Sequence, residues 1–556
     1  MSIPIRSILK NNIMKQLILL SIIAFLFSCT NSNTYYIDVE NGNDDNSGQS
    51  PKSAWASLEK VNALILLPGD KVLFATGSTF MGTIILENVS GTKENPIVIS
   101  SYESEGNNKL PVIDSKRFAN GVLLVNCSHV IVSNIEITGD GSGVATAKNA
   151  KQNMHCGVLI TTSEPNTFEN IQLKNLVIQD VFFEKKGFKR GKDEVRTANG
   201  SQSYGWGIRV INSTKNAVLQ DILVENCEIK NVAHTGIKFT GRDKSIHNIK
   251  LYNNSVYGTG GPGIQMSGVN TGHVKNNHVN RSGSNNDSRK WGRGSGLWTW
   301  SSSDVIIENN SFRNANGPGD SAGCHIDFNC NNVIVQYNLS ENNAGGFCEI
   351  LGNNYNCAYR YNVSINDGHR VKGENRAFQE GKIFWLSGFN GKGKKRNGPF
   401  NSYFFNNTVY VKKDVVAKIA VDRASSGVLI ANNIFYIEGE SQAVKGDQYK
   451  PETEGESRVE NIVFQNNLYL KKGNWPVEVL IQDENPIFGN PNFVNIGGIE
   501  LKDYIPKNVD LTKNKGIRIE PLSNDSIGLF IGLSVAHDIL GNEIMDLPDL
   551  GAIEIK

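Results

Sequence analysis

The sequence has few cysteines and no excess of charge of either sign. Its 556 residues include 8 cysteines and no Cys-x-x-Cys pair, which argues against a zinc site. Seven cysteines remain after Cys29, and an odd number cannot complete a disulfide framework. We therefore expect most of them to be small buried hydrophobes, with Cys330 and Cys357 as one candidate bridge. Lys and Arg number 56 against 55 Asp and Glu, so no global field favours nucleic acid or a membrane surface.

Proline is also scarce, with 16 residues, whereas glycine is abundant at 55. This balance predicts many tight turns rather than long helices. The sequence carries neither a Walker phosphate loop nor a His-Glu-x-x-His zinc motif, which removes two common enzyme classes from consideration.

Long apolar runs are confined to the N-terminus. The stretch "MKQLILLSIIAFLFSC" begins at Met14 with a lysine, continues as an apolar run and reaches Cys29. It resembles a bacterial lipoprotein signal, which implies a signal peptide over 1–28, lipidation of Cys29 and a tether over 29–34. A plain secretory signal or a membrane helix is the alternative, but the run is short for a span. We expect a protein held at the bacterial outer membrane by its lipid anchor alone.

A pattern of alternating apolar residues that ends in Asn recurs along the chain, mostly at spacings of 22 to 34 residues. Examples are "VIVSNIEI", "IKLYNNSV", "VIIENNSF" and "VLIANNIF". Strict alternation indicates strands, and a repeat of this length with Asn at a fixed turn is typical of a solenoid. The recurring Asn residues are expected to form a hydrogen-bonded ladder from coil to coil. They are Asn134, Asn175, Asn226, Asn254, Asn277, Asn310, Asn338, Asn362, Asn407, Asn433 and Asn467.

These repeats predict an all-β fold, a right-handed parallel β-helix in one domain over 35–556. Residues 35–75 contain a strand, an acidic turn "NGNDDNSG" and an amphipathic helix from Trp55 to Leu64, and are expected to form an N-terminal helical cap. The coils are expected over about 76–470, and the last coils and a C-terminal cap over about 471–556. The acidic turn is expected to be solvated, with Ca²⁺ binding as the alternative.

The opening segment, the Asn ladder and the ending "LGAIE" resemble the extracytoplasmic parallel β-helix proteins of polysaccharide-degrading bacteria. This family includes polysaccharide lyases, glycoside hydrolases and some epimerases, so the resemblance implies a carbohydrate-active protein. Because one fold hosts several chemistries, the function has to be read from the site.

A second recurring strand, beginning with Gly each time, predicts that site. The first, third and fifth residues after this Gly are expected to point into the coil, because side chains alternate along a strand. The strands are "WGIRVINS", "TGIKFTGR", "PGIQMSGV", "SGLWTWSS" and "AGCHIDFN". The outward residues of consecutive coils then form a column of useful groups, because adjacent coils lie about 4.8 Å apart. The column contains Arg209, Lys238, Gln265, Trp298 and His325, and a second one contains Thr240, Ser267, Trp300 and Asp327. Trp298 and Trp300 are expected to be sugar-stacking platforms.

The register of "GGFCEILG" decides whether Asp327 has a carboxylate partner. Anchoring this strand on Gly345 rather than Gly346 leaves Glu349 outside and places it directly beside Asp327, which avoids burying an unpaired carboxylate. The strand spacing is compatible with the carboxyl pair of a retaining glycosidase. Similarity to β-helical hydrolases of the β-xylosidase type implies Asp327 as nucleophile and Glu349 as acid/base. Asp320 could serve instead in an inverting pair, and His325 could bind a sugar hydroxyl or tune Asp327.

Basic insertions interrupt the long coils and favour an anionic sugar. The candidates on them are Arg196, Arg293, Arg370 and Lys372. They support an alternative, a polysaccharide lyase with Arg209, Lys238 or His325 as base and a Ca²⁺ held by Asp327 and Glu349. The paired carboxylates and tryptophans favour a glycoside hydrolase without a metal, and a non-catalytic glycan-binding module is the third hypothesis. We expect a monomer whose partner is a polysaccharide or oligosaccharide.

Overall fold

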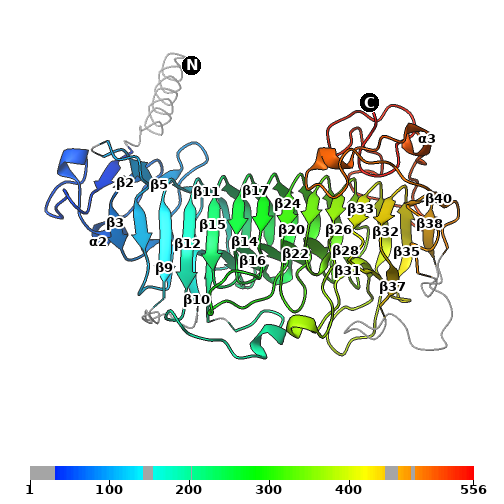
Figure 1. Cartoon of the computed structure of the whole chain (residues 1–556). Coiled ribbons are helices and arrows are strands. Elements are labelled where there is room, and N and C mark those ends of the chain that lie inside the picture. The colour runs from blue at the N-terminus through cyan, green and yellow to red at the C-terminus, as the bar shows by residue number, and fades with distance from the viewer. Residues whose placement is uncertain (1–31, 105, 142–153, 202, 445–460, 477–481) are drawn as a thin grey trace, which may run out of the picture.

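The computed structural model describes residues 32–104, 106–141, 154–201, 203–444, 461–476 and 482–556. Over these ranges the chain winds into an elongated coil of three parallel sheets (Figure 1). Each strand pairs with the equivalent strand one coil further on, as β13 (Tyr204–Asn212) does with β16 (Ile237–Gly241). The predicted all-β parallel β-helix is therefore confirmed. The predicted signal over 1–28 and the lipidation site Cys29 lie outside the described residues and stay predictions.

From β2 to β39, strands of sheets I, II and III follow one another in the same order along the chain. Sheet I contains β1 (Thr34–Ile37), β2 (Lys71–Ala75), β5 (Ile97–Tyr102), β8 (Val130–Ser133), β11 (Thr167–Lys174), β14 (Val218–Glu225), β17 (Ile246–Tyr252), β20 (Val269–Lys275), β23 (Ser303–Glu308), β26 (Asn331–Gln336), β29 (Ala358–Arg360), β32 (Phe400–Phe405), β35 (Ser426–Ala431) and β38 (Ile462–Gln465). Sheet II contains β3 (Thr79–Met81), β6 (Val112–Asp114), β9 (Glu136–Asp140), β12 (Val177–Phe182), β15 (Glu228–Val232), β18 (Ser255–Tyr257), β21 (His278–Asn280), β24 (Ser311–Arg313), β27 (Leu339–Glu341), β30 (Val363–Ile365), β33 (Thr408–Val411), β36 (Ile434–Ile437), β39 (Leu468–Tyr469) and β40 (Ile487–Phe488). Sheet III contains β4 (Ile84–Glu87), β7 (Asn120–Val125), β10 (Met154–Thr161), β13, β16, β19 (Ile264–Ser267), β22 (Leu297–Trp300), β25 (Cys324–Ile326), β28 (Gly346–Ile350), β31 (Lys382–Leu386), β34 (Ala417–Val421) and β37 (Ser441–Ala443).

Apolar side chains from alternate strand positions fill the interior of the coil. One continuous hydrophobic cluster runs from Ile37 to Tyr469 and draws on all three sheets. The predicted inward residues of sheet III belong to it or are fully buried beside it, as Ile208, Val210 and Thr299 show. The period of two along each strand therefore assigns inside and outside correctly for these coils.

The predicted asparagine ladder is present, but it occupies two neighbouring turn positions rather than one. From Asn254 onward the side chains lie inside the coil, and each Nδ2 donates to the Oδ1 of the next residue at about 2.9–3.0 Å. The buried ladder comprises Asn254, Asn277, Asn310, Asn338, Asn362, Asn407, Asn433 and Asn467. Asn134, Asn175 and Asn226 instead adopt positive φ one residue earlier, the left-handed conformation that Asn tolerates at a turn.

Helices are short in the described part of the chain. The predicted helix over Trp55–Leu64 is shorter in the structure, where α2 spans Leu58–Asn62 and buries Leu58 and Val61. In the acidic turn, Asp44 accepts hydrogen bonds from the Ala56 and Ser57 amides. That the N-terminal segment acts as a cap stays a prediction. The remaining helical elements are η1 (Pro51–Ser53), η2 (Glu194–Arg196), η3 (Arg242–Lys244), η4 (Glu374–Arg376), η5 (Leu501–Tyr504) and α3 (Val509–Thr512).

The seven cysteines after Cys29 are all free and buried. The candidate bridge between Cys330 and Cys357 is therefore wrong. Cys330 Sγ instead lies 3.6 Å from Thr299 Oγ1, and Cys357 Sγ donates to Tyr355 O. The thiols act as small buried hydrophobes, as predicted, and burial raises the pKa of Cys330 to about 12.

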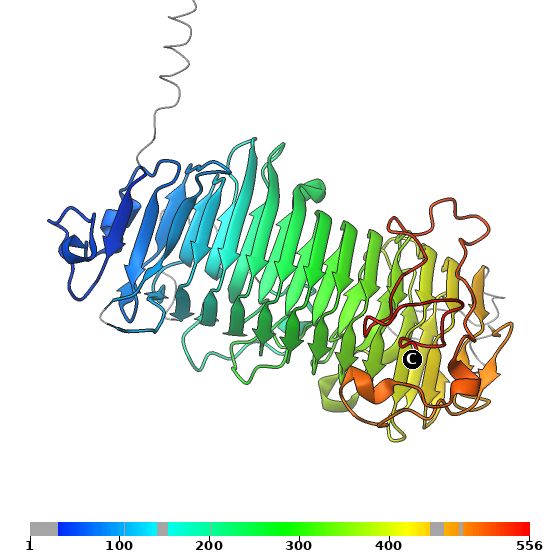
Figure 2. The same ribbon diagram turned by 90° about the horizontal axis from the view of Figure 1, so that it is seen from above.

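The C-terminal segment folds back along the outside of the solenoid (Figure 2). Asn432 accepts the Ile517 amide on its side chain, and Arg360 donates to Gly532 O at 2.8 Å. The ending "LGAIEI" is predicted to belong to a closing coil. In the structure, Leu550 and Ala552 instead pack on the outer face of sheet II beside Ile434. Apolar side chains on the outer faces of the late coils explain this path, since they need cover from water.

Candidate functional site

The outward column predicted on sheet III is present from β13 to β25. Arg209 pairs with Lys238, Lys238 with Gln265, Gln265 with Trp298, and Trp298 with His325. Ser267 likewise pairs with Trp300 in the second column. Sequence periodicity thus brings these side chains onto one face of consecutive coils.

The predicted register of the next strand is wrong. In β28, Ile350 pairs with Ile326, and Gly346 forms a bridge with Ala322. Glu349 therefore follows His325 in the first column and is not beside Asp327. Asp327 itself lies just beyond β25, and the following Phe328 is half-buried outside the coil rather than in the core as expected.

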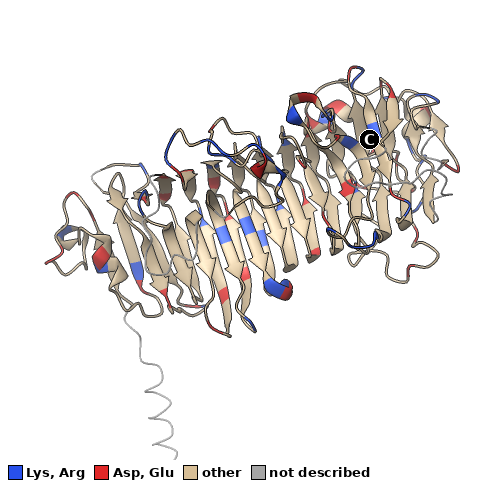
Figure 3. Cartoon of the chain, turned by 90° about the horizontal axis from the view of Figure 1, so that it is seen from below, with Lys and Arg blue, Asp and Glu red and all other residues tan. Residues whose placement is uncertain are grey.

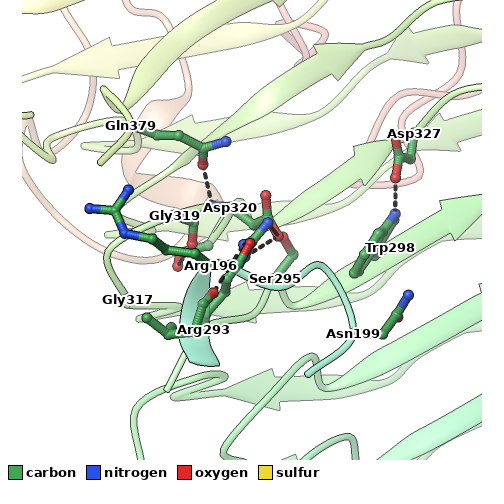
Figure 4. Close-up of polar contacts among 12 residues, drawn as sticks. Arg196, Asn199, Arg293, Ser295, Trp298, Gly317, Gly319, Asp320, Asp327 and Gln379 are labelled. Carbon is green, nitrogen blue, oxygen red and sulfur yellow. Dashed lines mark hydrogen bonds and ion pairs between the residues drawn. The ribbon is translucent and has the colours of Figure 1, made fainter. Parts of the chain in front are cut away.

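A pocket of about 530 Å³ opens over this face of sheet III. Its walls come from β19 and β22, from the segments before β22 and on both sides of β25, and from the long insertions after β12 and β31. Two of the lining residues are carboxyl groups, Asp320 and Asp327 (Figure 4). The other lining residues are Arg196, Ala198, Asn199, Gln265, Arg293, Trp298, Trp300, Phe328, Phe389 and Lys392.

Asp320 is held in the turn before β25 by a cation from the preceding coil. Arg293 Nε and Nη2 each lie 2.7 Å from Asp320 Oδ2, and Gln379 Oε1 accepts the Asp320 amide at 2.6 Å. A Cβ on Gly319 would lie 2.3 Å from the Phe378 ring, so this tight approach requires glycine. Asp320 and Ser321 both have positive φ, at 46° and 66°. Such conformations are costly for non-glycine residues and often occur at functional sites.

The pKa values of Asp320 and Asp327 are shifted in opposite directions. Burial acts to raise the pKa of Asp320, but the Arg293 guanidinium outweighs it and the pKa is lowered. Burial raises the pKa of Asp327 to about 7, although the Phe328 amide and the Trp298 indole donate to it. Trp298 Nε1 lies 2.6 Å from Asp327 Oδ2. At neutral pH the pocket therefore contains one ionised carboxylate and one carboxyl that carries a proton part of the time.

His325 and Glu349 lie behind the pocket lining. His325 Nδ1 is 3.0 Å from Ser295 Oγ and 4.0 Å from Glu349 Oε2. Burial lowers the pKa of His325 to about 4, and burial also raises the pKa of Glu349 well above its usual range. Both side chains are more than nine-tenths buried and neither lines the pocket.

Two of the predicted substrate-binding arginines make hydrogen bonds within the protein that fix the loops around the pocket. Arg293 lines the pocket but is committed to Asp320 and to the carbonyl oxygens of Val195 and Arg196. Arg370 is buried and donates to the carbonyl oxygens of Gly317, Asp320 and Gln379, so it fixes the turn that presents Asp320. Arg196 is exposed at the pocket rim, 5.0 Å from the Phe378 ring, whereas Lys372 is exposed and does not line the pocket.

The two tryptophans play different roles. Trp298 is 7% exposed and its indole is occupied by Asp327, whereas Trp300 is 37% exposed. Trp300 packs edge-on against Phe328, which packs edge-on against Phe389. These three rings form an aromatic wall of the pocket, and sequence reasoning found only Trp300 of them.

The remaining predicted residues line the end of the same face. Gln265 reaches the pocket, whereas Arg209 and Lys238 lie beyond it under the insertion that carries Asn199. Sequence reasoning missed Asn199, because nothing in its local pattern marks it. Within the described ranges, no three His, Cys, Asp or Glu side chains converge as a metal site would require. Asp327 and Glu349 are not register partners, and Ca²⁺ binding by them stays a prediction.

Charged residues of both signs are interspersed over the molecule, several of them in the loops that leave the strands (Figure 3). In the described part of the chain, no helix combines the length and apolar character needed to cross a bilayer.

Comparison with known proteins agrees with the fold. Residues 188–364 match the family model described as right handed beta helix region. A lacto-N-biosidase of Bifidobacterium longum subsp. longum is 25% identical over an alignment of 626 residues, which covers 94% of this chain and 36% of that protein. The chain thus spans about a third of the length of this curated relative.

Solved structures give the same result. The GH136 lacto-N-biosidase of Eubacterium ramulus superposes with a TM-score of 0.54 at 22% identity, over 74% of this chain and 68% of that one. Its selenomethionine derivative gives 0.51 at 21% identity. The right-handed parallel β-helix and the predicted resemblance to β-helical carbohydrate-active proteins are confirmed.

Proposed function

We propose that the protein is a glycoside hydrolase that cleaves an oligosaccharide in the pocket over sheet III, with Asp320 and Asp327 as its two carboxyl groups. One observation carries the proposal: a single pocket contains a carboxylate with a lowered pKa and a carboxyl with a pKa of about 7. Two carboxyl groups with separated pKa values are the usual equipment of a glycosidase. The similarity to a protein named lacto-N-biosidase supports the oligosaccharide substrate.

Asp327 is suited to be the general acid. Its carboxyl is more than nine-tenths buried, which favours the protonated form, and it can pass that proton to the oxygen of the scissile glycosidic bond. The Trp298 indole and the Phe328 amide fix the carboxyl and stabilise the charge left after proton transfer.

Asp320 is suited to be the partner that meets the sugar. The Arg293 guanidinium keeps it ionised, so it can accept a proton from water or attack the sugar carbon directly. The carbonyl contacts of Arg370 hold the Asp320 turn in place, so the two carboxyl groups keep a fixed relation through the reaction.

The aromatic wall is suited to bind the substrate. Trp300, Phe328 and Phe389 present ring faces or edges beside the carboxyl pair. Sugars carry apolar C–H faces that pack against such rings, and the burial of this surface supplies affinity without charge.

Replacement of either carboxyl tests the proposal. We expect Asp327→Asn and Asp320→Asn each to lower kcat/KM by on the order of 10²–10⁴. The assay follows reducing ends on a panel of neutral and acidic oligosaccharides, together with the ultraviolet absorbance of unsaturated uronates. In the wild type, kcat/KM should fall as the pH rises above about 7, because Asp327 loses its proton.

Glu349→Gln is the matched control, because it removes a carboxylate on the next coil that does not line the pocket. This variant should keep activity within about tenfold, since it alters only the surroundings of the pair. Loss of activity in Glu349→Gln with full activity in Asp320→Asn would refute the assignment. Unsaturated products would instead establish a polysaccharide lyase.

A further inference from the structure

Two buried cations lie side by side next to the pocket. Arg209 on β13 and Lys238 on β16 are register partners in the outward column of sheet III, and they are 5% and 4% exposed. Arg209 Nη1 donates to Thr240 Oγ1 at 2.9 Å, and Lys238 Nζ lies 3.2 Å from Asn199 Oδ1. Both cations also lie over the Trp206 ring, at 4.7 and 5.1 Å.

This pair differs from the other buried cations of the described chain. Arg209 and Lys238 have no carboxylate partner among the described residues, and each donates a hydrogen bond to a neutral side chain only. Of the six other buried cations, three contact carboxylates and three donate to carbonyl oxygens: Arg289, Arg293 and Lys418 belong to the first group, and Arg360, Arg370 and Lys382 to the second.

Uncompensated charge of this kind is costly. Removing an ion from water costs several kcal/mol unless a partner of opposite charge replaces the water. Here two like charges occupy adjacent strands, which lie about 4.8 Å apart. Burial and then the neighbouring Arg209 lower the pKa of Lys238 well below its usual range.

Unpartnered polar atoms surround the two cations. Arg209 Nε, Trp206 Nε1 and Gln265 Oε1 are buried, and none has a hydrogen-bond partner within the described protein. Buried polar groups are nearly always satisfied in native proteins, so three such atoms on neighbouring coils leave hydrogen-bonding capacity that a ligand would satisfy. The set offers two N–H donors and one acceptor, in addition to the ammonium group.

The cluster is continuous with the pocket. Gln265 and Asn199 line the pocket, and the Asn199 amide oxygen contacts both Gln265 Nε2, at 3.4 Å, and Lys238 Nζ. The Asn199 backbone is held separately, since His234 Nε2 lies 3.2 Å from its carbonyl oxygen. The side chain of Asn199 can therefore swing away while its loop stays in place.

We propose that Arg209 and Lys238 form a subsite for a negatively charged substituent, a carboxylate or a sulfate, carried by one sugar of the substrate. The Asn199 amide oxygen occupies the place of the anion in the free protein. Gln265 binds a hydroxyl or amide hydrogen of the same sugar through Oε1. The inference rests on the proposed hydrolase function and specifies its substrate as an acidic oligosaccharide.

Direct anion binding tests the subsite without reference to turnover. The probes are inorganic sulfate and glucuronic acid, with glucose as the neutral control, each titrated into the full chain by calorimetry at constant ionic strength. We expect saturable binding of at least one anion and none of glucose, and the preferred anion distinguishes sulfate from carboxylate. Absence of binding for both anions would overturn the proposal.

Variants of the chain test whether the anion binds at Lys238. Lys238→Met should weaken binding at least tenfold and should not lower the unfolding midpoint, because it removes an uncompensated charge. Lys230→Met on β15 is the matched control, because this lysine side chain is 38% exposed and already paired with Glu228, and it should bind as the wild type does. Asn199→Ala should tighten binding several-fold, since it removes the oxygen that competes with the anion. Equal affinity in the wild type and Lys238→Met would refute the assignment.

Activity measurements distinguish a failure of the anion subsite from a failure of the proposed hydrolase function. If the subsite is correct, Asp327→Asn keeps anion binding while Lys238→Met loses activity on acidic oligosaccharides but not on neutral ones. Anion binding by Lys238 without any hydrolysis that depends on Asp320 or Asp327 would refute the hydrolase and leave the subsite standing. Equal rates on acidic and neutral substrates in the wild type would refute the subsite's role in specificity.

Discussion

Single buried carboxyl groups determine how this solenoid responds to pH. Asp367 lies inside the coil, where its Oδ1 accepts hydrogen bonds from the Asn343 amide and Asn343 Nδ2, and its Oδ2 lies 2.6 Å from Ser364 Oγ. Burial nevertheless raises its pKa to about 7. The carboxyl accepts hydrogen bonds from Asn343 in the interior of the coil, so it carries charge where the fold needs only an acceptor.

We expect Asp367→Asn to stabilise the protein at alkaline pH. The folded state keeps the Asp367 proton up to about pH 7 whereas the unfolded chain releases it near 3.8, so this carboxyl's stabilising contribution is lost as the pH rises between these values. At pH 8 the variant should exceed the wild type by about 2–4 kcal/mol in free energy of unfolding, and at pH 4 the two should be close. Urea titrations at both pH values measure the difference.

The exposed Asp193→Asn serves as the control for that comparison, because it removes the same charge from the surface. Its free energy of unfolding should follow the wild type at both pH values. A difference between Asp367→Asn and the wild type that stays constant with pH would contradict the assigned pKa.

At the same scale, the sequence could identify the candidate carboxyl groups but not their pairing. Asp327 is recognisable because it alternates outward on a strand with known neighbours. Asp320 looks like an ordinary turn residue, because the contacts that make it functional come from Arg293 one coil earlier and from Gln379 far along the chain. Nothing local in "GPGDSAG" encodes those partners.

At the scale of the element, the inward turn with the Asn ladder stabilises the stack of coils. Each ladder residue bonds the coils on both sides, as Asn310 does through Val274 O, the Asn277 amide and Asn338 Oδ1. We expect Asn310→Ala to lower the free energy of unfolding by about 2–4 kcal/mol, because it leaves buried partners unsatisfied. Urea denaturation followed by circular dichroism measures the change.

The adjacent Asn309 provides a matched control on the same turn. It is exposed and has a φ of 55°, which glycine adopts without strain. Asn309→Gly should therefore change stability by no more than about 0.5 kcal/mol. Similar losses in the two variants would show that the turn conformation, rather than the ladder, stabilises the stack.

The period of two along the sequence predicts which residues form strands, but it does not predict the register in which neighbouring strands pair. Alternation predicted which residues of β13 to β25 face inward, because it depends only on strand geometry. The register of β28 depends on how many residues the preceding turn uses, and "NNAGG" uses more than a minimal coil would. Glu349 therefore lies beside His325 and not, as predicted, beside Asp327. The same one-residue ambiguity merged two turn positions into one predicted Asn column.

At the scale of the whole molecule, the C-terminal segment acts as a strap over the late coils. It covers an apolar outer face that includes Tyr403 and Leu429, and Leu529 packs into that face. Asp525 fixes it, because its carboxylate lies 2.5 Å from Tyr403 OH, accepts from Asn356 Nδ2, and also accepts the Ile527 and Gly528 amides. Asp525 is therefore one anchor of the strap, beside the contacts of Asn432 and Arg360 with the same segment.

We expect Asp525→Ala to release this strap while the solenoid stays folded. The variant leaves buried donors without an acceptor, which costs about 2–5 kcal/mol and falls on the segment that Asp525 anchors. Limited proteolysis should cleave the variant between 515 and 550 at least tenfold faster than the wild type and leave a stable solenoid fragment. Asp546→Ala, at an exposed position of the same segment, should be cleaved as the wild type is. Global unfolding of Asp525→Ala, without a protected fragment, would instead show that the strap and the coils form one cooperative unit.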